Sequence, residues 1–522
     1  MSVTPDHEVV VIGAGPGGIA TGVKLKQAGI DDFVIIDRAS GPGGTWHEYT
    51  YPGISVDLPV VLYQFTFDRS KTWTNLFPPG AEIQRYHADV ATRHGLDPHF
   101  RFGIEIERQI WDDAGHHWTL HTARGDIITA RFIVVATGGF LNPKDAPIPG
   151  LDTYNGLIQR PGRWNNEIGY RGLRVGIVGT GASAVQIIAE IAPQVQSLTV
   201  FQRTPPWVFP RPRIPMQRFP FSLTWLPGVV PLVHFVGEIG IDIFSQSAAK
   251  LSPPKALIIA GGRTFDAVAK ALYRPYLYSR VRNREARRAL RPNYGPAAKR
   301  PTFNSAFLPT FDRDNVHLVT EAADHFTEHG LVTASGAEHE LDLVVMATGH
   351  EMFTEPMDYH LGTIVGRDGF DLAQFWRANG MQAYDSVSVP GVPNRWMTSG
   401  PYAGGSTGWH DQVERAADHA ITAIKAARER GATLVEVHKH VHDAYHRAQH
   451  RYVRPATYYF TEVNKHVNTY YRNSHGDSPI AMVGGVFRAK RRARTIDNDV
   501  YRFERVAAVT ERRSAAAKPV ST

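Results

Sequence analysis

The chain of 522 residues contains no cysteine. Disulfides, thiolate metal sites and dithiol redox chemistry are therefore excluded, and no metal site is predicted. Long apolar runs are scarce as well. The most apolar segment, residues 219–244, is broken by Pro227 and Pro231 and lacks the ~20 consecutive apolar residues that a membrane-spanning helix needs. We expect a buried or interfacial helix pair in this segment rather than membrane contact.

The start of the chain also lacks the features of a targeting segment. It carries neither a basic region nor a long apolar region before the apolar run Val9–Ile12, and we therefore expect a cytoplasmic protein. Lys and Arg outnumber Asp and Glu by 57 to 50, a net charge of +7, which suits anionic ligands such as nucleotide phosphates. The densest basic stretches, residues 282–291 and 488–494, come with no recognisable nucleic-acid-binding fold, so no nucleic acid partner is expected.

What the sequence does contain is one short motif that occurs twice. In the first copy, an apolar run meets GAGPGG at residues 13–18, and a later apolar run ends on Asp37. In the second copy, an apolar run meets GTGASA at residues 179–184, and a later apolar run ends on Gln202 and Arg203. The interval from the last motif position to Asp37 equals the interval to Arg203, 19 residues in each copy. This repetition predicts two sites of the same kind.

Each copy has the glycine pattern of a dinucleotide-binding turn. The first glycine makes the tight turn from strand to helix, the second lets the backbone approach a pyrophosphate, and the last small residue lets the helix pack on the strand. Two copies, each after an apolar run, predict two dinucleotide sites. The predicted binding residues are Gly13, Gly15 and Gly18 in the first copy and Gly179, Gly181, Ser183 and Ala184 in the second.

The residues that follow the two later strands predict different nucleotides. Asp37 can accept hydrogen bonds from the free ribose hydroxyls of an adenosine, and it would repel a 2′-phosphate. Arg203 can make charge-assisted hydrogen bonds to a phosphate, and Thr204 can add a hydroxyl donor. We therefore expect FAD at the first site and NADP(H), in preference to NAD(H), at the second.

The connections between the copies indicate how the domains are arranged. Apolar strands end in Ala-Thr-Gly at residues 136–138 and 347–349, where we expect the chain to cross between domains, and the proline-rich residues 142–152 follow the first crossing. The predicted fold class is α/β, with two Rossmann-like dinucleotide-binding domains, one inserted in the other, and a small helical subdomain. The expected bounds are 1–142 and 351–522 for the FAD-binding domain, 153–213 and 297–350 for the NADP-binding domain, and 214–296 for the helical insertion.

From Glu8 to about Gly485 the chain resembles the type I Baeyer–Villiger monooxygenases, within the flavin-containing monooxygenase superfamily. The segments that carry the resemblance are GGTWHEYTYPGISVDLPVVLYQFTF (43–67), VFQRTPPWVFPR (200–211), AAKRPTFN (297–304) and MTSGP (397–401). The resemblance implies that Thr45, Trp46, Asp57 and Tyr63 contact the flavin. It also implies that Lys299 reaches the NADP 2′-phosphate and that Arg300, oriented by Asp57, is the active-site arginine.

This resemblance implies an NADPH- and FAD-dependent monooxygenase that inserts one oxygen atom of O2 next to a ketone carbonyl through a C4a-peroxyflavin. The product would be an ester or lactone, and the partners would be O2 and a small apolar ketone. A permanently charged Arg300 is suited to stabilise the anions that form along this path. An apolar substrate pocket is expected from the aromatic residues near the C-terminus, Tyr458, Tyr459, Phe460 and Tyr471.

Two departures from the family pattern keep other functions open. The family fingerprint Phe-x-Gly-x-x-x-His-x-x-x-Trp reads YNGLIQRPGRW at residues 154–164, with Arg160 in place of the histidine. In the segment NTYYRN (468–473), Tyr470 stands near the sequence position at which the family commonly has a tryptophan. The alternatives are an N- or S-oxygenating flavin monooxygenase, or a flavin- and NADP-binding redox protein with uncoupled NADPH oxidase activity.

Overall fold

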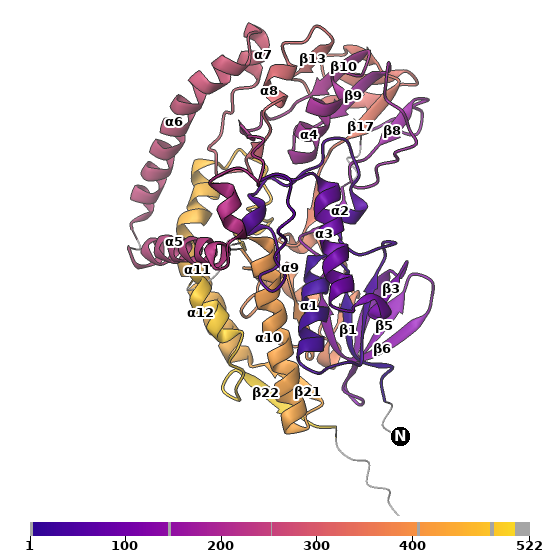
Figure 1. The fold of residues 1–522 in the computed structure, drawn as a ribbon, viewed down its shortest axis with the longest axis vertical. Coiled ribbons are helices and arrows are strands. Elements are labelled where there is room, and N and C mark those ends of the chain that lie inside the picture. Colours follow the sequence, from indigo (N-terminus) through magenta and orange to yellow (C-terminus); the bar gives the residue numbers. More distant parts are fainter. Residues whose placement is uncertain (1–3, 145–147, 252, 405–407, 481–484, 507–522) are drawn as a thin grey trace, which may run out of the picture.

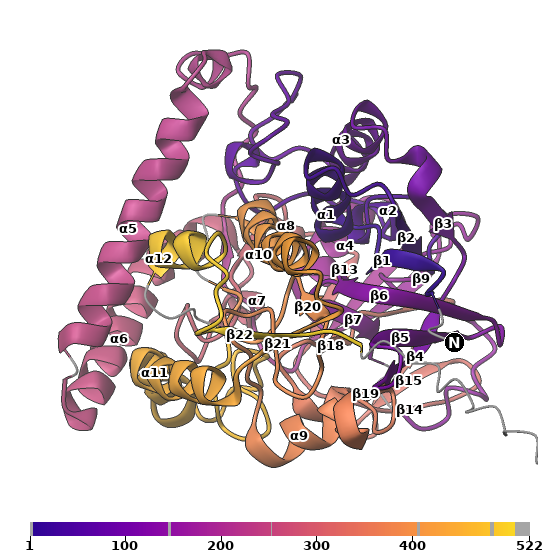
Figure 2. The same cartoon turned by 90° about the horizontal axis from the view of Figure 1, so that it is seen from below.

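Two sheets of mostly parallel strands form the frame of the molecule, one near each end of its long axis (Figure 1). The computed structural model describes residues 4–144, 148–251, 253–404, 408–480 and 485–506. Helices from the last third of the chain and from the middle of the sequence lie on the opposite flank of the molecule from the first sheet (Figure 2).

The first sheet has the strand order β19-β4-β5-β6-β1-β2-β3, and β20 also pairs with β6. The ladders β3-β2-β1-β6 and β20-β6 are parallel, whereas β4 and β5 pair antiparallel with each other and β5 with β6. Residues Val9–Ile12 are all buried, as expected of a central strand that is covered on both faces. The strands are β1 (His7–Ile12), β2 (Phe33–Asp37), β3 (Phe100–Phe102), β4 (Ile106–Asp112), β5 (His117–Thr122), β6 (Ile127–Val135), β19 (Ile364–Val365) and β20 (Arg395–Met397).

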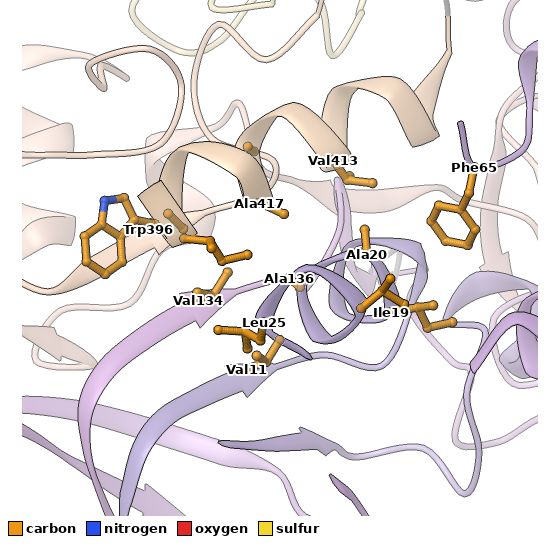
Figure 3. Close-up of a cluster of buried hydrophobic side chains, with 14 of the residues drawn as sticks. Val11, Ile19, Ala20, Leu25, Phe65, Val134, Ala136, Trp396, Val413 and Ala417 are labelled. Carbon is orange, nitrogen blue, oxygen red and sulfur yellow. The ribbon is translucent and has the colours of Figure 1, made fainter. Parts of the chain in front are cut away.

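Helix α1 (Pro16–Gln27) lies between this sheet and the long helix α10 (Trp409–Arg430). Figure 3 shows Ile19 and Ala20 of α1 near Val413 of α10, in the largest buried apolar cluster. This packing joins the beginning of the chain to its last third in one core. The other elements of this part are α2 (Thr45–Glu48), α3 (Gly80–Arg93), α9 (Leu372–Asn379), β21 (Leu434–Val437), α11 (Lys439–Tyr458), α12 (Gly485–Arg492) and β22 (Tyr501–Glu504).

The second sheet is entirely parallel, with the order β13-β10-β9-β17-β8. Helix α4 follows β9 directly and buries its apolar residues in a separate core cluster. The elements of this part are β8 (Leu157–Gln159), β9 (Arg174–Val178), α4 (Ala182–Ile191), β10 (Ser197–Phe201), α8 (Phe307–Thr310), β13 (Val316–Val319), β17 (Leu343–Met346) and a three-stranded antiparallel sheet of β14 (Ala323–Phe326), β15 (Gly330–Thr333) and β16 (Glu338–Glu340).

The chain crosses between the two parts directly after each Ala-Thr-Gly segment, as the sequence predicts. The outgoing strand β7 (Phe140–Pro143) and the returning strand β18 (His350–Met352) pair antiparallel to form a two-stranded ribbon. Residues 145–147 of the proline-rich connection lie outside the described residues. The predicted fold class, with one Rossmann-like unit inserted in another and a helical subdomain, is confirmed.

The helical insertion leaves the second part at β11 (Val208–Phe209) and returns at β12 (Thr302–Phe303), and these two strands pair. Between them lie α5 (Val229–Leu251), α6 (Lys255–Arg280) and α7 (Arg284–Ala289). The segment expected to form a buried or interfacial helix pair is helical. Burial is wrong for most described apolar side chains of α5, although Val230 is buried. Leu232 and Val236 are 60% and 59% exposed, because the side of α5 that faces the protein carries polar residues instead. Among the described residues, no helix is long and apolar enough to cross a membrane.

Candidate active site

The first glycine turn is shaped by close backbone contacts. Gly13 has φ +112°, and a Cβ atom there would lie 2.4 Å from the Ala136 carbonyl oxygen of the Ala-Thr-Gly segment. A Cβ at Gly18 would lie 1.8 Å from the Gly13 carbonyl oxygen. Gly15 is the N-cap of α1, and no side chain caps that helix end and no acidic residue lies in its first turn. The free amide groups of α1 can therefore bind phosphate.

Asp37 lies at the end of β2 beside this turn. One oxygen of its carboxylate accepts a hydrogen bond from the Ala14 amide at 2.5 Å, and the other accepts one from the Ala39 amide at 2.8 Å. A carboxylate offers about four lone-pair positions, so both oxygens keep acceptor capacity for ribose hydroxyls. Gly44 closes over the turn, since a Cβ there would lie 2.9 Å from the Gly15 Cα atom. The geometry fits an adenosine with an unphosphorylated ribose.

The residues that the resemblance assigns to the flavin lie on the segment that follows. Thr45 and Trp46 begin α2, and Thr45 is exposed. The Trp46 indole donates a hydrogen bond to the Tyr63 hydroxyl at 3.0 Å. Burial raises the pKa of Tyr63 to about 12, so its hydroxyl stays protonated at neutral pH. Trp46 and Tyr63 thus hold each other in place.

Beneath Tyr63 lies a pair of histidines that the sequence reasoning missed. His410 contacts the Tyr63 ring edge-on at 4.6 Å between centroids, and its Nε2 lies 2.8 Å from the Nε2 of His87. Burial lowers the pKa of His87 to about 3 and that of His410 well below its usual range. Both rings are therefore neutral, and one donates to the other. These residues are 323 positions apart, so no local pattern could have indicated the pair.

The second glycine turn repeats the geometry of the first. Gly179 has φ +104°, and a Cβ there would lie 2.6 Å from the Ala347 carbonyl oxygen. Gly181 is the uncapped N-cap of α4, and no atom lies within 4 Å of a Cβ built on it, which leaves room for a ligand. Ala184 is fully buried against the sheet, and Ser183 is hydrogen-bonded to the Tyr51 hydroxyl. The four predicted residues of this copy thus surround one turn.

The strand pairing corrects one detail of the comparison between the copies. Phe201 pairs with Val178, and Ile36 pairs with Ile12, so Gln202 rather than Arg203 occupies the register of Asp37. The Gln202 side chain is buried and donates to the Ala289 carbonyl at 2.9 Å. Equal spacing in the sequence did not give equal register. The stretch from Val178 to its partner Phe201 is one residue shorter than the stretch from Ile12 to its partner Ile36.

Arg203 therefore lies one residue past the register of Asp37, where it is exposed. Lys299 approaches it from the segment that returns from the helical insertion. Burial, and next the charge of Arg203, lower the pKa of Lys299. Thr204 is tied to the glycine turn, because its carbonyl accepts a hydrogen bond from the Thr180 hydroxyl at 2.9 Å. Two neighbouring cations beside an uncapped helix end fit a ligand with an additional phosphate.

Arg300 and Asp57 meet, although they lie 243 positions apart in the sequence. Nε and one terminal nitrogen of Arg300 donate to the two oxygens of Asp57, at 2.9 and 2.5 Å. The Arg300 side chain is 42% exposed. Its partial desolvation would lower the pKa of Arg300, but the Asp57 carboxylate outweighs this and raises that pKa above the usual range. Tyr470 and Tyr471 also act on the Arg300 charge, and their hydroxyls lie 3.3 Å apart. Arg300 keeps its second terminal nitrogen for another acceptor.

A further contact between the two glycine turns was not predicted. The Tyr51 hydroxyl donates to the side-chain oxygen of Gln186 on α4 at 3.0 Å, and the Gln186 amide donates to the Ser55 carbonyl at 3.0 Å. Arg211 also donates to the Ser55 hydroxyl. The sequence Tyr-Pro-Gly at residues 51–53 was the local signal for this contact. Glycine is needed there because a Cβ at Gly53 would lie 2.9 Å from the Gln186 carbonyl oxygen. The segment before Asp57 is thus anchored on α4.

The turn that contains Arg160 packs beside the crossing ribbon. A Cβ at Gly162 would lie 2.9 Å from Pro143 of β7 and 3.3 Å from the Tyr49 hydroxyl. That hydroxyl lies 2.5 Å from Nε2 of His350 in β18. The altered fingerprint therefore lies at the connection between the two sheets.

The C-terminal aromatic residues differ in their contacts. Phe460 and Tyr471 lie 5.6 Å apart between ring centroids, and Tyr471 adjoins Arg300. Tyr459 instead donates to Asp266 of α6 at 2.6 Å, and Tyr458 contacts the charged groups of Lys255 and Arg454. Of these four residues, Tyr471 acts on the charge of the predicted active-site arginine, and Phe460 contacts both Tyr471 and Tyr459.

The first part of the chain matches a known protein family. Residues 10–216 match the model described as pyridine nucleotide-disulphide oxidoreductase. The match covers the first glycine turn, the second glycine turn and the strand that follows it. The disulfide chemistry in that description cannot apply here, because the chain has no cysteine.

Similarity to whole proteins is broader. The chain is 34% identical over 401 residues to a Baeyer–Villiger monooxygenase of Streptomyces coelicolor, covering 76% of this chain and 73% of that protein. It is 30% identical over 448 residues to a Baeyer–Villiger monooxygenase of Pseudomonas aeruginosa, covering 84% and 81%. The solved structure of cyclohexanone monooxygenase from Rhodococcus sp. Phi1 bound to NADP+ superposes with a TM-score of 0.78 at 25% identity, covering 96% of this chain and 100% of that one. The chain belongs to the Baeyer–Villiger monooxygenase family.

Proposed function

We propose that this chain is an NADPH- and FAD-dependent monooxygenase that inserts one oxygen atom of O2 next to the carbonyl of a small apolar ketone. The observation that carries the proposal is the two-pronged pair of Arg300 and Asp57. It places a permanent cation, with donors left over, beside Tyr63 and Tyr470. Such a donor is required where negative charge develops on oxygen, and it is not required for oxygen transfer to a soft nitrogen or sulfur atom.

The residues of the first glycine turn fit FAD. The uncapped helix α1 and the close approach of Gly15 and Gly44 suit a pyrophosphate, and Asp37 suits the ribose. Thr45, Trp46, Asp57 and Tyr63 follow on the same segment, where they would contact the isoalloxazine. When bound, FAD reduced by NADPH supplies the activation of dioxygen from which one oxygen atom enters the product.

The residues of the second glycine turn fit NADPH. Gly179, Gly181, Ser183 and Ala184 would hold the pyrophosphate at the N-terminus of α4. Arg203, Thr204 and Lys299 would bind the 2′-phosphate, since neither cation forms an ion pair with a carboxylate among the described residues. The expected domain bounds stay part of this proposal, and the β11–β12 pair at residues 208–209 and 302–303 supports a separate helical insertion. The cytoplasmic location stays a prediction.

Arg300 and Asp57 have separate tasks in this proposal. Its guanidinium stabilises the negative charge that develops on the ketone oxygen, and Asp57 fixes the orientation of its donors without taking all of them. Because Asp57 holds the pKa of Arg300 high, the arginine stays charged throughout the reaction. Arg300 therefore acts as a fixed donor and never as a proton source.

The test is product formation by purified holoenzyme with NADPH, O2 and a panel of ketones and sulfides. We expect ester or lactone from ketones. Arg300→Ala should keep bound flavin but lose ester formation by roughly 100- to 1,000-fold, because a missing oxyanion donor costs ~2.7–4 kcal/mol. Arg300→Lys should recover little, since an ammonium lacks the planar fork of donors.

Arg428→Ala is the matched control, because Arg428 makes a similar two-pronged pair with Glu8. Neither of these two residues belongs to the proposed site. It should leave ester formation near the wild-type rate. Ester formation by Arg300→Ala at the rate of this control would overturn the assignment. Sulfoxide as the only product of the wild type would overturn the proposed reaction.

A further inference from the structure

Helix α5 is oriented opposite to an ordinary surface helix. The side that faces the protein begins with the buried Val230 and is polar after it. His234 hydrogen-bonds the Val61 carbonyl at 2.8 Å, and Glu238 accepts from Lys490 at 2.5 Å. Asp242 accepts from the Val486 amide at 2.5 Å. These three residues are spaced by four, are all less than a tenth exposed and lie on one face of the helix. They attach α5 to the body of the protein by polar contacts.

The opposite side of α5 is apolar and faces solvent. Leu232, Phe235, Val236 and Ile243 are 60, 51, 59 and 63% exposed. Within residues 229–240 and 242–243, no exposed side chain is polar. A soluble helix normally places its polar face outward, so this arrangement is unfavourable unless something apolar covers it.

Helix α6 continues the same arrangement. Leu257, Phe265, Val268 and Leu272 are 63, 52, 52 and 72% exposed, and their spacing places them along one side of the helix. On the other side, Asp266 is buried and accepts hydrogen bonds from Tyr459 at 2.6 Å and Asn464 at 3.0 Å. Both helices lie along one flank of the molecule (Figures 1 and 2).

The charges on these two helices are all of one sign where they are exposed. The exposed ionisable residues among their described side chains are Lys255, Arg263, Arg274 and Arg280. Arg263 and Arg274 are eleven positions apart, about three turns, and therefore lie along the same edge of the apolar side of α6. The described acidic residues of α5 and α6 are Glu238, Asp242 and Asp266. All three are buried, and each accepts a hydrogen bond from another part of the protein. Lys255 is ion-paired with Glu462, so the cations that remain for a partner are Arg263, Arg274 and Arg280. Among the described side chains of α5 and α6, no acidic one is exposed.

We propose that the outward sides of α5 and α6 bind the surface of an anionic lipid bilayer, with the helices lying in its interface. An apolar helix face edged by Lys and Arg is the composition that inserts between acyl chains and headgroups. A second copy of the chain is a poorer occupant, because a symmetric contact would place this cationic surface against itself. No described helix could cross the bilayer, so the contact is peripheral.

The test is flotation of the purified holoenzyme with vesicles of phosphatidylcholine, alone or mixed with phosphatidylglycerol. We expect binding to the mixed vesicles, weaker binding to phosphatidylcholine, and loss of the difference at high salt. Equal binding to both vesicles would overturn the role of the cations. Absence of binding to either, or concentration-dependent dimerisation that the variants below abolish, would overturn the proposal.

Two matched pairs of variants locate the surface. Leu232→Ser with Val236→Ser should weaken binding roughly tenfold or more, whereas Ile127→Ser with Leu361→Ser, at residues 57 and 58% exposed elsewhere, should not. Arg263→Glu should weaken binding to mixed vesicles by at least about fivefold, and exposed Arg124→Glu should not. Bound flavin and NADPH oxidation report folding of every variant, because none of these residues lies at either glycine turn. Equal losses for surface and control variants would overturn the assignment of this face.

Discussion

The two glycine turns of this protein share a backbone and differ in their side chains. Gly13 and Gly179 have φ values of +112° and +104°, and a Cβ at either would come within 2.6 Å of the carbonyl oxygen of an Ala-Thr-Gly segment. Each is followed by a helix without a capping side chain. In the proposed function both turns hold a pyrophosphate on this shared frame, and so the choice between two nucleotides must come from residues outside it.

The differences lie at two places. At the last motif position, Gly18 touches the Gly13 carbonyl, whereas Ala184 is accommodated in a buried position. After the second strand, Asp37 turns toward its glycine loop, whereas Gln202 turns away and leaves Arg203 exposed beside Lys299. The first turn thus has a carboxylate beside it, and the second has two cations.

The largest effect is expected from Gly18→Ala. Its Cβ would lie 1.8 Å from a backbone oxygen, so the turn must open and the bound FAD should fall to less than about a tenth of the wild-type content. Flavin released by denaturation measures this content. Full flavin occupancy in Gly18→Ala would show that the first turn tolerates an alanine at this position, as the second turn does at Ala184.

Arg203→Ala tests the choice of nucleotide. Loss of a charge-assisted phosphate contact, ~1.5–3 kcal/mol, should raise the KM for NADPH by roughly ten- to a hundredfold and leave NADH nearly unchanged. Steady-state NADPH and NADH oxidation measure both constants. An equal loss with the two coenzymes would remove Arg203 from the 2′-phosphate site, and exposed Arg124→Ala serves as the control.

A smaller effect is expected from pH. Burial and the charge of Arg203 lower the pKa of Lys299, so this amine loses its proton at a lower pH than an ordinary lysine. The cation is the form that binds phosphate, and the KM for NADPH should therefore rise severalfold as pH increases through that lowered pKa, before an ordinary lysine would lose its proton. Lys299→Arg should flatten the profile, and NADH should not follow it. A parallel rise for NADH would assign the titration to another group.

The smallest effect is expected from Ala184→Gly, which gives the second turn the residue of the first. It should lower the free energy of unfolding by only about 0.5–1 kcal/mol, the cost of glycine in a helix, and leave the KM for NADPH unchanged. Denaturant unfolding of the holoenzyme measures the first quantity. A large loss of NADPH binding would mean that the Ala184 methyl group shapes the phosphate site.

Most of the fold and part of the site could be predicted from the sequence. The glycine turns are local: their backbone angles and close contacts depend on neighbouring residues, and so a short pattern identified Gly13 and Gly179. The resemblance to the family placed Arg300 with Asp57, and the structure brings them together across 243 positions. Counting alone failed at Gln202, because spacing along the chain ignores the strand register.

Only the tertiary structure decided the remaining features, because they depend on contacts between distant segments. His87 meets His410 across 323 positions, and Tyr51 meets Gln186 across 135. The segment of α5 predicted a helix, but composition could not say which side faces the protein. That side was decided by Lys490 and by the Val486 amide, which satisfy Glu238 and Asp242 from 252 and 244 positions away and so leave the apolar residues outside. Burying charged groups is favourable only where partners are in place, and those partners exist only in the folded chain.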